Sequence, residues 1–162
     1  MSQEDILSII DDAFRDVPRP EHFTNYKHCG ECAEHDDLLR SRDRATLTIQ
    51  DLGSAGWNPI AFLTAEGFVY YFPALAKLAL SINGESFLAS FVPFHLYEAL
   101  AVEENGSPDN WLSALSKEQC NAILSFVRFV ADQKRSVLEL RAVDPEELDQ
   151  VVTFWKKECS SK

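Results

Sequence analysis

The clearest helix signal lies near the C-terminus, in residues 144–155, which read DPEELDQVVTFW. Asp144 is a typical N-cap residue, and Pro145 suits the first helical position, where the backbone N–H has no partner. The apolar residues that follow repeat on one helical face: Leu148, Val151, Val152 and Trp155. The stretch therefore predicts an amphipathic helix that packs on a core.

A second strong helix start precedes it in the chain. Ser116 and Gln119 have the spacing of a capping box, in which each side chain bonds the other residue's backbone N–H. Apolar residues then line one face: Cys120, Ile123, Leu124, Val127, Val130 and Ala131. Phe126 and Phe129 widen that face, which indicates a long, well-covered helix.

The first half of the chain contains weaker helix signals. Ser2 can cap a first helix, which Pro18 ends. The apolar face of this helix is Ile6, Ile9, Ile10, Ala13 and Val17. Thr64 can cap another that runs through Ala79, where Pro73 predicts either a kink or two helices meeting. Residues 86–101 read as helical on both sides of Pro93, although 87–94 could be a buried strand.

The remaining segments read as connections. Residues 46–52 predict a small helix or turn that ends at Gly53, and 56–59 and 105–108 predict loops. Apolar residues make up 46% of the 162-residue chain and charged residues 25%, which is ordinary globular composition. We therefore expect an all-α fold: a single irregular helical domain over residues 1–162, with about six helices and long connections.

The net charge of the chain limits the classes of binding partner that we expect. Acidic side chains number 26 against 15 basic ones, a formal net charge of -11. Such a chain lacks the clustered Lys and Arg that nucleic-acid phosphates or an anionic membrane attract, so we expect neither partner. A basic protein partner fits better. The acidic N-terminus does not resemble a signal peptide and charges interrupt every apolar stretch, so a cytoplasmic location is expected.

The candidate functional site is the segment 28–35, which reads HCGECAEH. Cys29, Cys32 and His35 offer two thiolates and an imidazole, the ligand types of zinc. A fourth ligand is expected from one of His28, His22, Asp36 or a water molecule. With water the site is open, and a nearby carboxylate could then act as general base: Glu31, Glu34 or Asp37.

Two other interpretations of this segment stay open. Cys29 and Cys32 could cycle between dithiol and disulfide, with His28 or His35 lowering a thiol pKa, although the adjacent carboxylates oppose that shift. No thioredoxin-like βαβ pattern surrounds the pair. Alternatively the cysteines and His35 are packing residues, because positions 29, 32 and 35 share one face of a helix.

Other chemistry-bearing residues are isolated in the sequence. Secondary candidates for a binding surface are Trp57, Tyr70, Tyr71 and His95. Each of them is also explained as a core or loop-packing residue. Cys120 reads as a small buried apolar residue, and Cys159 lies in a tail that we expect to fray. Four cysteines are too few for a disulfide framework in a chain of this length.

Motifs for phosphate, dinucleotide, serine-hydrolase and zincin chemistry are absent. Several short patterns together resemble a family of bacterial proteins of unknown function: Pro18-x-Pro20, then H-C-x-E-C-x-E-H at 28–35, Y-Y-x-P-A-L at 70–75, and a late L-S-x-E-Q at 115–119. The resemblance implies a bacterial origin and a single domain, and it implies no activity.

The sequence thus supports two function classes. The first is a small acidic interaction or regulatory protein with a structural zinc site at the Cys/His segment. The alternative is a metal- or thiol-dependent enzyme that uses Cys29, Cys32 and His35.

Overall fold

The computed structural model describes residues 1–53, 57–101 and 111–162, and the predicted all-α class is confirmed. Its α-helices are α1 (Gln3–Ala13), α2 (Gly30–Arg40), α3 (Ala65–Ala79), α4 (Glu85–Ser90), α5 (Ala99–Ala101), α6 (Lys117–Gln133), α7 (Arg135–Leu140) and α8 (Pro145–Ser160). Short 3-10 helices are η1 (Gln50–Leu52), η2 (Pro59–Phe62) and η4 (Trp111–Ala114), and η3 (Phe91–Glu98) is a π-helix. Within the described ranges there is no strand, and Thr24 forms an isolated bridge with Leu63.

The predicted helix starts are confirmed by their caps. The side chains of Ser2 and Ser116 both form capping boxes, with Asp5 and Gln119 as the reciprocal partners. The Thr64 hydroxyl accepts a hydrogen bond from the Gly67 N–H at the start of α3. The Asp144 carboxylate caps α8 in the same way. Local side-chain chemistry is therefore enough to place the starts of these four helices.

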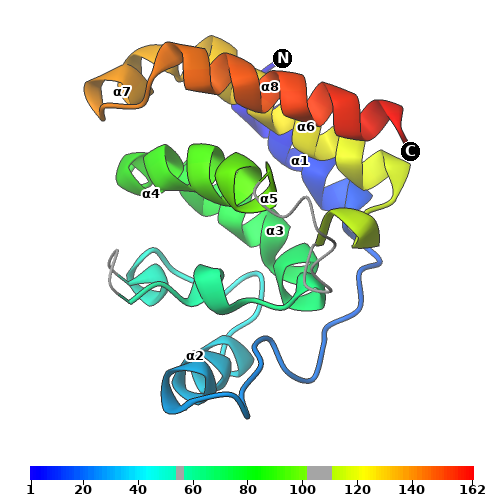
Figure 1. The fold of residues 1–162 in the computed structure, drawn as a ribbon, viewed down its shortest axis with the longest axis vertical. Helices are drawn as coiled ribbons and strands as arrows, with labels where there is room; N and C mark the ends of the chain where they lie inside the picture. Colours follow the sequence, from blue (N-terminus) through cyan, green and yellow to red (C-terminus); the bar gives the residue numbers. More distant parts are fainter. Residues whose placement is uncertain (54–56, 102–110) are drawn as a thin grey trace.

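The helices form layers that put α2 far from the termini (Figure 1). Helices α1, α6 and α8 pack side by side at one end, and α3 with α4 and α5 forms the middle layer. Helix α2 and the 3-10 helices η1 and η2 lie at the opposite end. Large aromatic side chains fill the interior, and the buried Trp155 indole donates a hydrogen bond to the Leu96 carbonyl at 2.8 Å. None of the described helices meets the length and apolarity needed to cross a membrane.

Helices α6 and α8 are joined by a disulfide between Cys120 and Cys159. Both cysteines are buried, and their Cα atoms lie 5.5 Å apart. The sequence interpretation of Cys120 as a buried residue was right, but the expectation that Cys159 lies in a frayed tail was wrong. Packing of the last turn of α8 on the first turn of α6 brings the two sulfurs together.

Several element boundaries differ from the sequence expectation. Helix α1 ends at Ala13, before Val17, because the chain turns where the Phe14 ring enters the core. Pro73 lies inside one helix, α3, and does not separate two. Residues 87–94 belong to α4 and the π-helix, so the strand alternative was wrong. Gly56 and the predicted loop at 105–108 lie outside the described residues.

Candidate functional site

Cys29 is the N-cap residue of α2, and this position decides the environment of its sulfur. The helix begins at Gly30, and the Cys32 backbone N–H donates a hydrogen bond to the Cys29 Sγ at 3.3 Å. An N-cap side chain normally supplies an oxygen to this N–H, and here a sulfur does so. The Cys29 side chain is exposed, whereas that of Cys32 is buried.

The two thiols differ in acidity as well as exposure. Their Sγ atoms form a hydrogen-bonded pair at 2.8 Å. This bond, the Cys32 N–H and a hydrogen bond with His28 lower the pKa of Cys29 to about 7. The same pairing and burial raise the pKa of Cys32. Hydrogen bonds to the Cys29 sulfur therefore outweigh the carboxylates that the sequence places nearby.

His28, Cys29 and Cys32 form a group that could hold a metal ion, since their ligand atoms all lie within 4.8 Å of one another. The Nδ1 atom of His28 lies 3.7 Å from the Cys32 sulfur. The structure thus brings together two of the three predicted ligands and one residue proposed for the fourth position. A tetrahedral zinc with Zn–S bonds of about 2.3 Å requires the sulfurs to move apart to roughly 3.8 Å.

His35, the third predicted ligand, lies outside this group. Its ring is 1% exposed and packs between the rings of Trp57 and Phe62, at centroid distances of 4.5 and 4.6 Å. Its Nε2 lies 3.5 Å from a Glu31 carboxylate oxygen, and neither ring nitrogen makes a hydrogen bond to a described residue. The side chains of Glu34 and Asp37 point into solvent. His35 therefore anchors α2 to η2.

His22 and Asp36, the other residues considered for a fourth ligand, pair with each other. Their Nδ1 and Oδ2 atoms lie 2.7 Å apart. The other Asp36 oxygen accepts hydrogen bonds from the backbone N–H groups of Phe23 at 2.6 Å and Thr24 at 3.2 Å. These bonds and His22 lower the pKa of Asp36 despite its burial. The carboxylate holds the segment before the cysteines against α2.

Tyr70 and Tyr71 are core residues that support this end of the molecule. The Tyr70 hydroxyl accepts a hydrogen bond from Arg19, and its carbonyl accepts one from Arg44 at 2.6 Å. The Tyr71 hydroxyl donates to the Leu39 carbonyl at the end of α2, and burial raises its pKa to about 12. The sequence analysis missed both arginines, because their partners lie 26 to 51 residues away.

Trp57 and His95, the two other secondary candidates, lie near the same short helix, η2. The Trp57 side chain covers His35 while 42% of the residue remains exposed. His95 is buried in η3, and its Nε2 lies 3.4 Å from the Asn58 amide nitrogen. Burial lowers the pKa of His95 to about 4, so its ring is neutral near pH 7.

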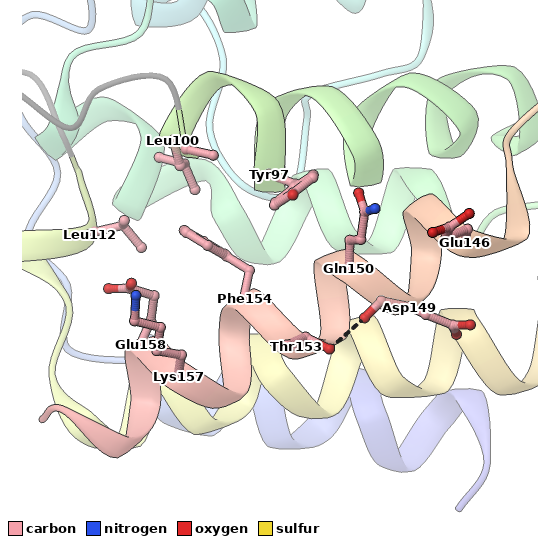
Figure 2. A pocket seen from close by; sticks show the side chains of 11 residues that line it. Tyr97, Leu100, Leu112, Glu146, Asp149, Gln150, Thr153, Phe154, Lys157 and Glu158 are labelled. Carbon is pink, nitrogen blue, oxygen red and sulfur yellow. Dashed lines mark hydrogen bonds between the residues drawn. The ribbon is translucent and has the colours of Figure 1, made fainter.

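A large cavity at the other end of the molecule contains none of the predicted site residues. It has a volume of about 610 Å³ and lies between Tyr97 and Leu100 on one side and α8 on the other (Figure 2). The rings of Tyr97 and Phe154 meet edge to face there at 5.6 Å. Asp149, one of its carboxylates, already forms an ion pair with Arg135.

The model of a family described as "Family of unknown function (DUF6714)" matches residues 2–159. Comparison with curated proteins and with solved structures found no match.

Proposed function

We propose, for this chain, which belongs to the family of unknown function DUF6714, that its Cys29–Cys32 pair carries out thiol–disulfide exchange. The observation that carries the proposal is the asymmetry of the pair: an exposed helix-cap thiol of lowered pKa in contact with a buried thiol of raised pKa. Such an arrangement separates an attacking sulfur from a resolving one.

In the proposed reaction, the Cys29 thiolate attacks one sulfur of a substrate disulfide. A mixed disulfide forms, and the first substrate thiolate leaves. Cys32 then transfers its proton to His28, whose Nδ1 lies 3.7 Å from the Cys32 sulfur, and attacks the Cys29 sulfur. The second substrate thiolate leaves, so two electrons pass from the dithiol to the substrate and a Cys29–Cys32 disulfide remains.

A zinc ion held by His28, Cys29 and Cys32 is the competing use of the same thiols. Three protein ligands leave the fourth position to water, as in catalytic rather than structural zinc sites. The 2.8 Å contact between the sulfurs favours the dithiol. A cytoplasmic location remains part of the proposal, and the Cys120–Cys159 disulfide counts against it, because such bonds are rare in reducing compartments.

The proposal is tested with oxidised glutathione as the substrate disulfide and Cys32→Ser as the trapping variant. Because Cys29 has a pKa of about 7, we expect its alkylation rate to rise through pH 7, about two pH units below an ordinary thiol. Cys32→Ser protein should accumulate one glutathione on Cys29, detected by peptide mass spectrometry. Wild-type protein should instead form the Cys29–Cys32 disulfide.

Cys29→Ser is the matched control, since it keeps a polar cap on α2 but lacks the attacking thiol, and it should form no adduct. Metal content is measured on the same samples. Near-stoichiometric zinc that disappears in Cys32→Ser, together with unreactive thiols in the wild-type protein, would contradict the exchange reaction. It would show instead that the two cysteines bind a metal ion.

A second candidate function is binding of a basic partner, and one surface favours it. Two adjoining hollows of about 450 and 580 Å³ follow the contact between α1 and α6 and share Asp12, Ala13 and Glu118. Apolar side chains such as Ile9, Val17 and Val69 line the hollows together with four carboxylates and two basic residues: Asp12, Asp16, Glu66, Glu118, Arg19 and Lys117. In the part of the chain that the structure describes, no basic side chain pairs with Asp16, Glu66 or Glu118. We propose that this groove, residues 9–20 with 117–125, takes an amphipathic basic segment of a protein partner.

The groove is tested with a fluorescent peptide of leucine and lysine in helical spacing. Glu118→Lys should weaken its binding by about tenfold, because it places a like charge against the peptide. Glu139→Lys makes the same charge change on the exposed face of α7 and serves as the control. Equal losses in both variants would show only general attraction to an acidic protein and would exclude the groove.

A further inference from the structure

A separate cavity of about 320 Å³ lies where η2 faces η3. Its lining includes four aromatic residues, Phe62, Phe68, Phe94 and Trp111. None of the described residues that line it carries a charged side chain, although the chain has a net charge of -11. Volumes of this size lie at the lower end of small-molecule sites.

Two of the described lining residues, His95 and Trp111, have a ring nitrogen, and the π-helix places His95 there. Helix η3 continues α4 and contains Pro93, which has no N–H to donate. The wider π-helical turn rotates side chains relative to a regular α-helix, and such turns are frequent at functional sites. His95 is 6% exposed, so its ring is held inside the protein.

The proton on His95 can be assigned from its neighbours. The Asn58 Oδ1 accepts a hydrogen bond from the Ile60 N–H at 3.0 Å, which makes Asn58 Nδ2 a donor. Because this donor lies 3.4 Å from His95 Nε2, that nitrogen must accept. The neutral ring therefore carries its hydrogen on Nδ1, and no hydrogen bond from Nδ1 to another described residue is present.

We propose that this cavity binds a small neutral molecule with a planar apolar body and a carbonyl-type oxygen that accepts a hydrogen bond from His95 Nδ1. The aromatic walls suit a planar body, since Phe68 and Trp111 already stack at 4.1 Å. Because the described part of the lining has no charged side chain, an ionic ligand would lose its hydration there without gaining a charged partner. Phe94, another lining residue, is 47% exposed, so this wall of the cavity reaches the surface.

The test uses three probes that differ in one property each: acetophenone, toluene and benzoate. Protein labelled with ¹⁵N on histidine side chains reports binding at His95 directly. Acetophenone should give a saturable shift of the His95 Nδ1 signal, with a dissociation constant on the order of 1 mM for so small a molecule. Toluene lacks the acceptor and benzoate adds a charge, so each should bind at least about fivefold more weakly.

His95→Phe keeps an aromatic ring but removes the donor, and it should abolish the preference for acetophenone over toluene. The wild-type spectrum alone also decides the matter if that variant does not fold. A proton on Nε2 in the free protein, equal binding of acetophenone and toluene, or no saturable shift with any probe would each overturn the proposal. Cys29→Ser should leave the result unchanged, so the site is tested independently of the exchange reaction.

Discussion

Replacing Cys159 with alanine should lower the free energy of unfolding by about 4 kcal/mol. The Cys120–Cys159 bond closes a loop with a sequence separation of 39, and a loop of that length restricts the unfolded chain by roughly this amount. The bond also fastens the last turn of α8 to the first turn of α6. Urea unfolding followed by circular dichroism measures the difference.

Reductant provides the internal check on this prediction. Wild-type protein should lose a similar stability when reduced, whereas Cys159→Ala should respond little. Cys29→Ser is the matched control, because this cysteine is exposed, lies outside the disulfide and keeps a polar cap on α2 when replaced by serine, and it should change stability by less than about 1 kcal/mol. Equal stability of Cys159→Ala and oxidised wild-type protein would mean that Cys120 and Cys159 only pack as thiols.

Replacing Asp36 with alanine should cost about 3 kcal/mol, the second large effect that we expect. The substitution leaves the backbone N–H groups of Phe23 and Thr24 without their acceptor, and both residues are buried. A buried donor without a partner costs about 1 to 3 kcal/mol. Asp36→Asn keeps one acceptor oxygen and should cost less. Asp37→Asn, on the exposed side of α2, should change stability by less than about 0.5 kcal/mol.

Acid should remove the Asp36 contribution. Its folded pKa is lowered from the ordinary 3.8, so the contribution is complete above 3.8 and is lost as the pH falls from there through the lower folded pKa. The stabilities of wild-type and Asp36→Asn protein should therefore converge as the pH falls below 3.8. A stable Asp36→Ala protein that had lost bound zinc would instead identify Asp36 as the fourth ligand that the sequence suggested.

The sequence predicted the starts of helices better than it predicted which side chains contact each other. Ser2, Thr64, Ser116 and Asp144 each cap the helix that their local pattern predicts. The end of α1 was harder to predict, because Val17 continues the apolar repeat although the chain has already turned at Phe14. Short helix α7 was not predicted at all, since no strong cap precedes Arg135.

At the candidate site, too, the sequence predicted local features better than contacts between distant residues. The sequence identified Cys29 and Cys32 from their two-residue gap, and the structure places their sulfurs in contact. It named His35 as the third ligand and His28 only as one candidate for the fourth. Cys29 caps the helix instead of lying within it, which brings His28 beside the sulfurs while His35 packs against Trp57 and Phe62.

The amino-acid sequence by itself determined the all-α class, the main helix starts and the Cys29–Cys32 pair, because caps, periodicity and short spacings act within a few residues. Only the tertiary structure decided that Cys120 bonds Cys159, that Asp36 holds the segment before α2, and that Asn58 directs the proton of His95. Each of these depends on atoms brought within a few ångströms from 13 to 39 positions apart, a distance that no local pattern encodes.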